Sequence, residues 1–336
     1  MKGTHHIIVQ NGSLKYEFDL KRNITILKGN SATGKTTLIE MVQEYLVDGA
    51  DSGINLSCDV ECRVLTGNLW KEQLANVSHA IVFIDEGNRF VRTEEFVEKI
   101  KKSDNYYVIV TRESLEMLPI SVTEIYGIRS SGKYGGLVPV YHEFYHIYGD
   151  EIRNKKNLYP ICPEILLVED SNAGYEFFSS VAREKGIQCI SANGKSNIFN
   201  FLIKNKNELK KETLIIADGA AFGSQMNRLE QILKQNNLLH LYLPESFEWI
   251  LLKSGLIRGS NIAEILDDTA EYVESREYFS WEQFFTAVLI QASKDSYLKY
   301  SKKKINKNYL KPFVKKRILE VMEGITIQNK NKTEFF

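Results

Sequence analysis

The sequence has little cysteine, proline or tryptophan, and it carries no net charge. Of its 336 residues, 4 are cysteines, 6 are prolines and 3 are tryptophans. Lys plus Arg and Asp plus Glu both number 43, so no overall field attracts nucleic acid or a membrane, and any such surface must be local. The first residues, MKGTHHIIVQNG, contain no apolar signal core, and no run reaches the roughly 18 apolar residues of a membrane span. We therefore expect a cytoplasmic protein without membrane contact.

The four cysteines do not have the spacing of a zinc site. Cys58 and Cys62 lie in an alternating, strand-like segment, and neither Cys162 nor Cys189 has a close Cys or His partner. Reduced thiols are the usual intracellular state, which we expect here. The chain is, in contrast, rich enough in apolar residues, at 43%, to bury the cores of two or three domains.

The pattern of apolar runs predicts an α/β fold with two sheets. In the first half of the chain, the runs are bounded by polar or helical sequence, as in the buried strands of a mostly parallel sheet. In the second half, strands alternate with helices, which implies a second parallel sheet. The predicted strands are 6–9, 14–20, 24–27, 80–84, 106–110, 124–128, 165–170, 187–191, 214–218 and 239–243, and the predicted helices are 36–45, 174–185, 197–205 and 224–235.

A polar segment separates the two predicted domains. RNKKN at 153–157 is followed by Pro160 and Pro163, as expected for a linker. Beyond about residue 250 the chain has a helical pattern and becomes basic. We therefore predict domains at 1–155 and 160–255, and a helical basic C-terminal region at 256–336.

A phosphate-binding motif stands between the strand at 24–27 and the helix at 36–45. In such a loop the backbone N–H groups hold phosphates, Lys35 reaches the β and γ oxygens, and the Thr36 hydroxyl binds magnesium. This predicts a P-loop NTPase domain that binds ATP and Mg²⁺. The predicted nucleotide-binding residues are Gly29, Asn30, Ser31, Ala32, Thr33, Gly34, Lys35, Thr36 and Thr37.

Acidic and basic residues follow two later strands at positions that suit hydrolysis. AIVFI at 80–84 leads into Asp85, a predicted magnesium ligand, and Glu86, predicted to orient or deprotonate the attacking water. YYVIV at 106–110 leads into Thr111 and Arg112, where a γ-phosphate sensor would lie. The pair of acids indicates hydrolysis of the nucleotide as well as binding.

The first domain resembles the ATP-binding heads of the ABC and RecF-like ATPases. The opening hairpin, the loop GNSATGKTTL, the strand VFIDE and the strand VIVTRES carry the likeness. Arg112 stands where those heads have a switch histidine, and nothing between Thr36 and Asp85 resembles their LSGGQ signature. The short spacing of the two motifs is closer to AAA-type ATPases, so an ABC-like dimer sandwich does not follow from the likeness.

Residues 142–146, HEFYH, match the zinc-protease pattern H-E-x-x-H. Zinc binding needs both histidines one helical turn apart on one face. The flanks, LVPVYHEFYHIYG, are instead dense in β-branched and aromatic residues with a period of two. We therefore predict a strand, half of a hairpin, in place of a zinc site.

A second acidic edge is predicted in the second domain. ILLV ends in Glu169 and Asp170, and LIIA ends in Asp218. Carboxylates at neighbouring strand ends converge on one edge of a parallel sheet, where they can hold the magnesium that assists phosphodiester cleavage. Capping of helices by the same acids is the structural alternative.

This domain resembles the TOPRIM domains that are fused to ATPase heads in OLD-family nucleases and related phage-defence ATPases. LLVEDSNAGYEFF, ISANGKSNIFNFL and LIIADGAAFG carry the likeness, with Glu169 and Asp218 at acid positions. Ala220 stands at the position of a further acid, which Asp170, Glu245 or Glu248 could replace. A response-regulator receiver, with Asp218 as phosphoacceptor, is the competing interpretation, but no strand ending in lysine follows LPESFEW.

The segment from Lys294 to Arg317 contains ten Lys or Arg residues and one Asp, interleaved with Tyr297, Tyr300, Tyr309 and Phe313. Such a segment can bind a phosphate backbone while its rings stack on bases, although charge runs are often solvated helix faces.

Together with the resemblances, the basic segment predicts an ATPase whose nucleotide state controls a TOPRIM-like nuclease in phage defence. The predicted catalytic residues are Lys35, Glu86, Glu169 and Asp218. The alternative is an ATP-driven switch whose degenerate second domain controls a separate effector or sensor protein, and in either case we expect a homo-oligomer.

Overall fold

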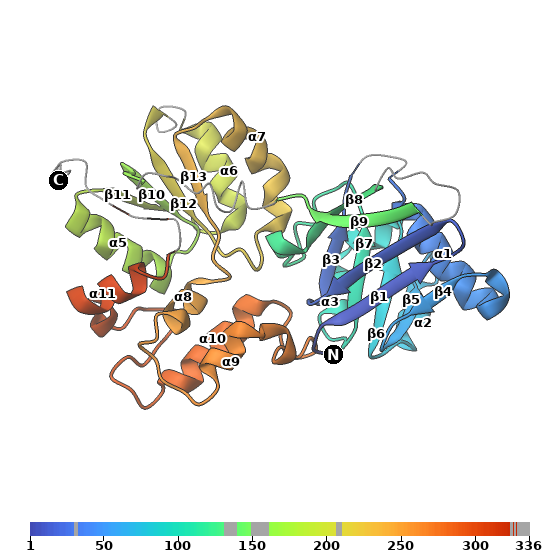
Figure 1. The fold of residues 1–336 in the computed structure, drawn as a ribbon. Helices are drawn as coiled ribbons and strands as arrows, with labels where there is room; N and C mark the ends of the chain where they lie inside the picture. The colour runs from blue at the N-terminus through green and yellow to red at the C-terminus, as the bar shows by residue number, and fades with distance from the viewer. Residues whose placement is uncertain are drawn as a thin grey trace. The chain divides into compact units, whose positions relative to one another are not determined.

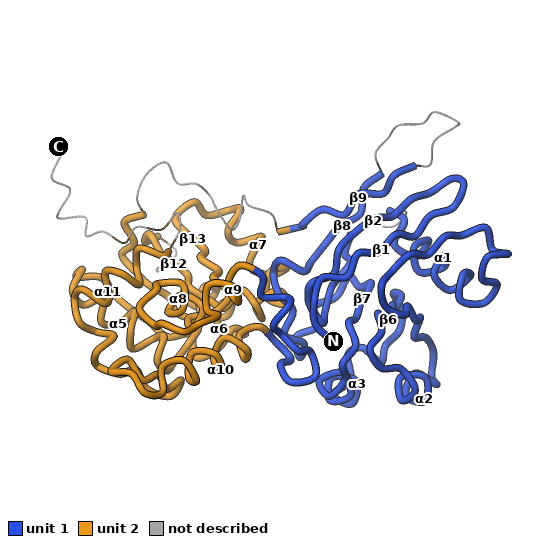
Figure 2. The backbone as a smooth tube through the Cα atoms, turned by 60° about the horizontal axis from the view of Figure 1, so that its bottom comes forward, with its two compact units in different colours: residues 1–147, 268–280 blue, residues 148–267, 281–336 orange. Residues whose placement is uncertain are grey.

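The computed structural model describes residues 1–29, 33–130, 140–148, 161–205, 210–322, 325 and 327. The chain forms two compact units, which Figure 2 colours separately. Unit 1 consists of residues 1–147 and 268–280, and unit 2 consists of residues 148–267 and 281–336.

Unit 1 is built on a nine-stranded sheet of order β4-β1-β2-β9-β8-β3-β7-β6-β5 (Figure 1). The strands β8, β3, β7, β6 and β5 are mutually parallel, whereas β1 pairs antiparallel with both β2 and β4, and β9 antiparallel with β8. The strand bounds are β1 His5–Gln10, β2 Leu14–Leu20, β3 Ile24–Leu27, β4 Asn55–Ser57, β5 Glu61–Val64, β6 Ala80–Ile84, β7 Tyr106–Val110, β8 Ile125–Ser130 and β9 Val140–His146.

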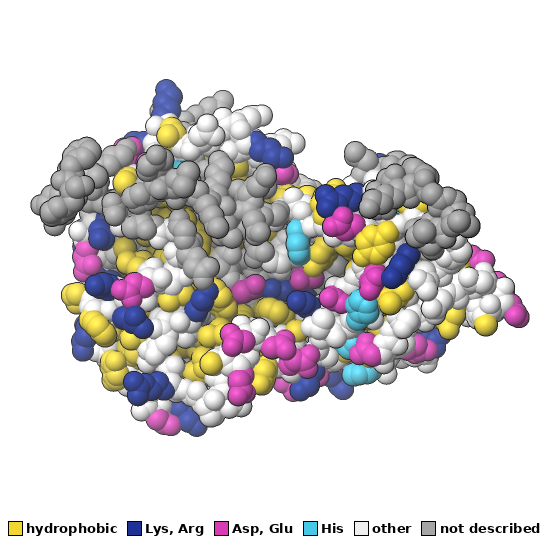
Figure 3. Space-filling model, in the orientation of Figure 1, with side chains coloured by type: hydrophobic (Ala, Val, Ile, Leu, Met, Phe, Trp, Pro, Cys, Tyr) yellow, Lys and Arg dark blue, Asp and Glu magenta, His cyan; other side chains and the backbone are white. Residues whose placement is uncertain are grey.

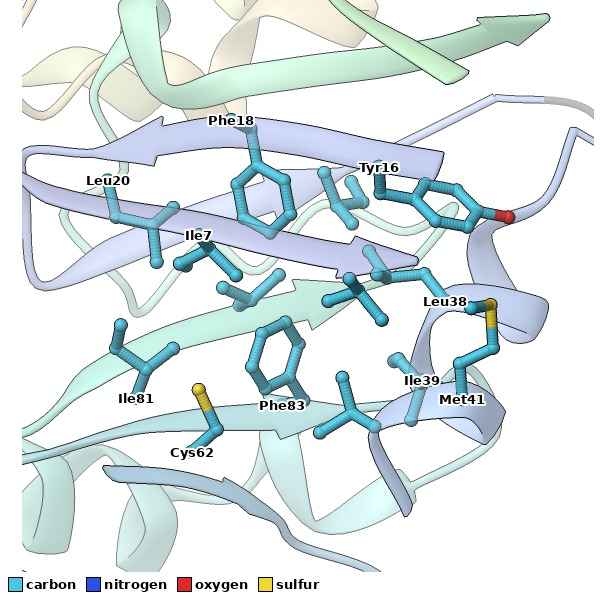
Figure 4. Packing of buried hydrophobic residues seen from close by; sticks show 14 of the residues in the cluster. Ile7, Tyr16, Phe18, Leu20, Leu38, Ile39, Met41, Cys62, Ile81 and Phe83 are labelled. Atoms are coloured by element: carbon cyan, nitrogen blue, oxygen red, sulfur yellow. The ribbon is translucent and has the colours of Figure 1, made fainter. Parts of the chain in front are cut away.

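The helices of unit 1 are short apart from the one that follows the phosphate-loop motif. They are α1 Lys35–Asp48, α2 Trp70–Ala75 and α3 Glu94–Ile100, with 3-10 turns η1 Gly49–Ser52, η2 Arg89–Arg92, η3 Val122–Glu124 and η6 Thr269–Glu271. Helix α1 buries Leu38, Met41 and Val42 in one core with Phe18 of β2 and Phe83 of β6 (Figure 4). Because strands β6 and β7 are buried along their whole length, their sequences read as unbroken apolar runs.

The N-terminus pairs with a segment from near the other end of the chain. Gly3 N donates to the Ala270 carbonyl at 2.8 Å, and Ser275 N donates to the Met1 carbonyl at 3.0 Å. The Met1 ammonium also donates to Ser275 Oγ and contacts the Glu274 carboxylate. The predicted C-terminal region, 256–336, is therefore shared between the units, because residues 268–280 belong to unit 1.

Unit 2 contains a four-stranded, fully parallel sheet of order β11-β10-β12-β13. Its strands are β10 Ile165–Val168, β11 Gln188–Ser191, β12 Thr213–Ile216 and β13 Leu239–Tyr242. Its helices are α5 Ala173–Lys185, α6 Lys195–Lys204, α7 Met226–Gln235, α8 Phe247–Lys253, α9 Ile262–Asp267, α10 Trp281–Ser293 and α11 Pro312–Leu319, with 3-10 turns η5 Gly223–Gln225 and η7 Lys307–Leu310.

The two sheets and their helices confirm the predicted α/β class, and the structure adds β4, β5, α2 and α3, which were not among the predicted strands and helices, between α1 and β7. The first sheet is mixed, because the opening hairpin and β9 add antiparallel pairs to its parallel part. HEFYH lies in strand β9, as predicted, and the expected turn of its hairpin falls in 131–139, outside the described residues. Among the helices that the structure describes, none combines the length and the apolar character needed to cross a membrane.

Candidate functional site

The phosphate-loop motif joins the end of β3 to the start of α1, as its predicted role requires. Residues 30–32 lie outside the described part of the chain, so the structure places Gly29 and the stretch from Thr33 onward. Gly29 and Gly34 have φ angles of 132° and 90°, backbone conformations that favour glycine. Gly34 is the N-cap of α1, and its carbonyl accepts the Leu38 N–H at 3.0 Å.

Gly34 is also packed against two aromatic rings, Tyr16 and His142, that were not predicted to belong to this site. Tyr16 Oη donates to the Gly34 carbonyl at 2.9 Å, and the His142 ring stacks on Tyr16 with centroids 4.6 Å apart. A Cβ atom at Gly34 would lie 2.7 Å from Tyr16 Oη and 3.0 Å from His142 Cε1. Burial lowers the pKa of His142. The first histidine of HEFYH therefore supports the start of α1, which only the pairing of β2 with β9 could have revealed.

Lys35 is buried and its ammonium group stays at the loop. Nζ donates to the Gly29 carbonyl at 3.2 Å and to Thr33 Oγ1 at 2.7 Å. Burial lowers the pKa of Lys35, while the carboxylate of Glu86 acts in the opposite direction. An ammonium held among backbone carbonyl and hydroxyl oxygens of a glycine loop is placed to meet phosphate oxygens.

Thr36 and Asp85 come together although 48 residues separate them in sequence. Thr36 Oγ1 lies 3.4 Å from Asp85 Oδ1. The loop after β6 fixes Asp85, because Glu86 N donates to its Oδ1 at 2.7 Å and Asn88 Nδ2 donates to its carbonyl at 2.9 Å. A hydroxyl and a carboxylate at this separation are hard oxygen donors of the kind that Mg²⁺ prefers.

Glu86 and Arg112 form an ion pair at the same edge of the sheet. Arg112 Nε lies 3.0 Å from Glu86 Oε1, and both side chains are partly exposed. Since β6 and β7 are neighbouring parallel strands, their carboxyl ends bring these two residues together. The predicted Thr37 is half-buried in the first turn of α1. The loop, the two acids and the arginine thus form one cluster.

A cavity of about 860 Å³ lies beside this cluster in unit 1. It extends along one side of α1, from Asp48 and Val47 to Asp85, and its other wall includes Thr66 and Gln73. No local pattern predicts this cavity, because its walls come from α1, α2, β5 and β6.

In unit 2, Glu169 and Asp218 meet at the carboxyl edge of the parallel sheet, as predicted. They follow the neighbouring strands β10 and β12. Asp218 N donates to Glu169 Oε2 at 3.0 Å, and Asp218 Oδ1 accepts the Phe247 N–H at 3.1 Å. Ala220, at the position of the further acid, is buried and donates its N–H to the Glu245 carbonyl at 3.1 Å.

Asp170 has a capping role at the start of α5. Its Oδ1 accepts N–H groups of Ser171 at 2.7 Å and Asn172 at 2.9 Å, and its Oδ2 accepts that of Gly174 at 2.7 Å. These bonds satisfy N–H groups that the helix leaves unpaired. Asp170 therefore caps a helix, which was the structural alternative for the strand-end acids. The metal-binding role predicted for Asp170 stays a prediction.

Residues from the C-terminal part of the chain complete the acidic site. A cavity of about 260 Å³ is lined by Glu169 and Asp218 together with Glu248, Glu282 and Lys302. Lys302 Nζ contacts the carboxylate of Glu282. Glu248 is buried and accepts the hydroxyl of Tyr300 at 2.7 Å. We therefore name Glu169, Asp218, Glu248 and Glu282 the acidic cluster.

Two members of the acidic cluster, Glu169 and Asp218, have raised pKa values. Burial, with Glu282 and Asp170 acting in the same direction, raises the pKa of Glu169 to about 7. Burial also raises the pKa of Asp218 well above its usual range, and the Glu282 and Glu169 carboxylates add to this effect. Burial alone lowers the pKa of Lys302, but the carboxylates of Glu282 and Glu248 outweigh it, so that pKa is raised.

The acidic cluster matches Mg²⁺ in the type of its donors but not in their number. Within the described residues, no group of three or more His, Cys, Asp or Glu side chains is arranged to hold a metal ion. The cluster holds the lysine ammonium of Lys302 instead. Of the three predicted magnesium ligands of unit 2, Glu169 and Asp218 form a pair, Asp170 lines the same cavity, and Lys302 lies beside them.

The basic C-terminal segment offers fewer rings to a partner than its sequence suggests. Tyr300 and Tyr309 are buried, and Tyr309 donates its hydroxyl to the Leu298 carbonyl at 2.6 Å. Tyr297 and Phe313 remain, with exposed fractions of 64% and 70%. On the face shown in Figure 3, cationic and anionic side chains are interspersed, so no large surface of one sign is visible there.

The sequence was compared with protein-family models and with curated proteins. No protein-family model matches the sequence. No curated protein matches it either.

Proposed function

We propose that unit 1 binds and hydrolyses ATP. The observation that carries this proposal is the convergence of Lys35, Thr36, Asp85, Glu86 and Arg112 on one glycine loop, with Thr36 Oγ1 3.4 Å from Asp85 Oδ1. These residues come from the ends of β6 and β7 and the start of α1, where a doubly wound sheet places its ligand site.

Each residue of this cluster has a role that follows from its position. Lys35 binds phosphate oxygens from its place at the loop. Thr36 and Asp85 would hold Mg²⁺, which when bound neutralises phosphate charge. Glu86 accepts the proton of the attacking water, and Arg112, 3.0 Å from Glu86 Oε1, stabilises charge on the transferred phosphoryl group.

We further propose that the nucleotide state of unit 1 controls a nucleolytic activity of unit 2 that depends on Mg²⁺. The pair Glu169 and Asp218 supports this, since both carboxylates lie at the edge where parallel strands present their catalytic groups. A divalent ion there would activate water and stabilise the leaving oxygen. Tyr297, Phe313 and the exposed lysines of the C-terminal segment are candidate nucleic-acid contacts.

The second candidate function is an ATP-driven switch with a non-catalytic unit 2 that acts on a separate effector or sensor protein. Two observations favour it. Asp170 is engaged in capping α5, and Ala220 is a buried alanine with a backbone hydrogen bond. Under this candidate the pair Glu169 and Asp218 serves the packing of the sheet edge.

A cleavage assay separates the two candidates. Plasmid DNA and single-stranded RNA are incubated with the chain in Mg²⁺ or Mn²⁺, with and without ATP. The nuclease proposal predicts cleavage that Glu169→Ala abolishes, whereas Asp267→Ala, a substitution at an exposed acid of unit 2, leaves it intact. Absence of cleavage by the wild type under all of these conditions would establish the switch as the better account.

Phage defence in the cytoplasm, by a homo-oligomer, is the setting that we propose from the resemblance to defence ATPases. The test is plaque formation on bacteria that express the chain. Protection that is lost with Lys35→Ala supports the proposal, and equal plaque numbers with and without the chain over a broad phage panel would refute it.

A further inference from the structure

Cys58 and Cys62 lie on either side of a short bend in unit 1. Cys58 directly follows β4 and Cys62 lies within β5, so three residues separate them in sequence. Cys62 is 4% exposed in the core that Figure 4 shows, and the partly exposed Cys58 packs against the same core. The two side chains are hydrogen-bonded to each other. The bend therefore holds one accessible thiol against one buried thiol.

Contacts with β1 fix the bend independently of the two thiols. Asp59 Oδ2 lies 2.9 Å from Nδ1 of His5, which is a buried residue of β1. Cys58 Sγ donates to Asp59 Oδ1 at 3.5 Å. Strand β4, which leads into the bend, is itself paired with β1. The sheet and the contact between Asp59 and His5 thus set the position of Cys58 beside Cys62.

The two thiols differ in how readily they lose a proton. The hydrogen bond with Cys62 lowers the pKa of Cys58, although burial and the Asp59 carboxylate act in the opposite direction. The same hydrogen bond, together with burial, raises the pKa of Cys62. Because the thiolate is the reactive form of cysteine, Cys58 is the nucleophile of the pair, and Cys62 is the thiol that can react after it.

Two thiols, an imidazole and a carboxylate are also the ligand types of a zinc site. Within the described residues, however, no group of three or more such side chains is arranged to hold a metal ion. Two thiols in contact can instead be joined by oxidation, and a partly exposed thiol of lowered pKa is the kind that reacts first with an oxidant. Oxidation is therefore the chemistry that fits Cys58 and Cys62.

We propose that Cys58 and Cys62 form a site of reversible oxidation by hydrogen peroxide. The Cys58 thiolate attacks one peroxide oxygen, so that an S–O bond forms, the O–O bond breaks, and the departing hydroxide takes up a proton to become water. The Cys62 thiol then loses its proton to solvent and attacks the Cys58 sulfur. An S–S bond forms as the S–O bond breaks, and the second hydroxide is protonated to water. The thiols lose two electrons in total, and exchange with an external thiol restores them.

Peptide mapping of the wild-type chain after treatment with hydrogen peroxide tests the proposal. We expect the peptide that contains both cysteines to lose the mass of two hydrogens, at least about tenfold faster than Cys189 is oxidised, and to regain it in dithiothreitol. Cys189 is the internal control, because it is partly exposed like Cys58 but burial raises its pKa to about 12. Oxidation of the pair no faster than that of Cys189, or the absence of a bond between Cys58 and Cys62, would overturn the proposal.

Two variants assign the roles within the pair. In Cys62→Ser the hydroxyl can still donate to the Cys58 sulfur, but no second thiol follows, so we expect a sulfenic acid at Cys58 that dimedone traps. In Cys58→Ser the remaining Cys62 is buried, so we expect little dimedone product. Trapping at Cys62 in Cys58→Ser, as fast as trapping at Cys58 in Cys62→Ser, would overturn the assigned roles.

A reagent that needs both thiols but no oxidant gives a second measurement on the wild-type chain. Phenylarsine oxide condenses with two neighbouring thiols and releases one water. We expect it to protect Cys58 and Cys62 together from alkylation, while alkylation of Cys189 is unchanged. Alkylation of Cys58 at the same rate with and without the arsenical would contradict the proposal. None of these measurements uses ATP turnover, so their outcome is independent of the proposed function.

Discussion

At the scale of single residues, Gly34 shows how backbone and packing act together at the phosphate loop. Its φ of 90° favours glycine, and a Cβ atom would lie 2.7 Å from Tyr16 Oη. We expect Gly34→Ala to lower the stability of unit 1 by about 1–3 kcal/mol and to weaken ATP binding. Thermal unfolding and binding of a fluorescent ATP analogue measure the two effects.

Two further variants test whether the close contact between the new Cβ atom and Tyr16 Oη causes the loss of stability in Gly34→Ala. Gly12→Ala places a Cβ atom where nothing lies within 4 Å, so it should change neither quantity. Tyr16→Phe removes the hydroxyl that the new Cβ would meet, so it should restore part of the stability of Gly34→Ala. A double variant no more stable than Gly34→Ala would exclude the Tyr16 hydroxyl as the cause and leave the backbone angle and the contact with His142.

Glu169 gives a prediction about pH. Its folded-state pKa of about 7 lies above the ordinary value of 4.5, so between these values the folded chain binds more protons than the unfolded chain. Its contribution to stability therefore falls as pH rises through this window. In buffer with a chelator, Glu169→Gln should gain stability relative to the wild type between pH 5 and pH 8. A difference in melting temperature that is the same at both pH values would contradict this.

At the scale of elements, Lys315 ties α11 to α5. It is buried, its Nζ donates to Ser180 Oγ at 3.1 Å, and it contacts the carboxylate of Glu184. We expect Lys315→Ala to destabilise unit 2 by about 1–3 kcal/mol, since both the packed stem and the polar contacts are lost.

The neighbouring residue provides the control for that prediction. Lys316→Ala, on the exposed side of α11, should stay within about 0.5 kcal/mol of the wild type. Lys315→Met keeps the apolar stem of the side chain, so it should lower the stability of unit 2 less than Lys315→Ala does. The Glu184 carboxylate, which is 52% exposed, can be hydrated when the ammonium is absent. Equal melting temperatures for all of these variants would mean that the contacts of Lys315 contribute nothing to the stability of unit 2.

Most elements could be predicted because the apolar residues in their sequences repeat with the period of a strand or of a helix. HEFYH illustrates this: in strand β9 the half-buried His142 and Phe144 alternate with exposed residues, although the letters match a helical zinc motif. The strand-end acids were found for the same reason, since unbroken apolar runs such as 80–84 mark buried parallel strands. Local patterns, in short, fix local structure.

At the scale of the whole molecule, the contacts between distant segments were not predictable. The pairing of Gly3 with Ala270 and the arrival of Glu282 and Lys302 at the acidic cluster join parts of the chain that carry no shared pattern. The basic segment illustrates the consequence. Its composition suggested a nucleic-acid surface, yet Tyr300 and Lys302 lie at the acidic site and Lys315 is buried in the packing of α11.

Every function proposed for this chain depends on ATP hydrolysis by unit 1, which the release of inorganic phosphate measures most directly. We predict turnover by the wild-type chain and by Lys21→Ala, which alters an exposed lysine of unit 1. Lys35→Ala removes the ammonium held at Gly29 and Thr33, so its turnover should fall to background. Turnover by Lys35→Ala at the wild-type rate would contradict the account.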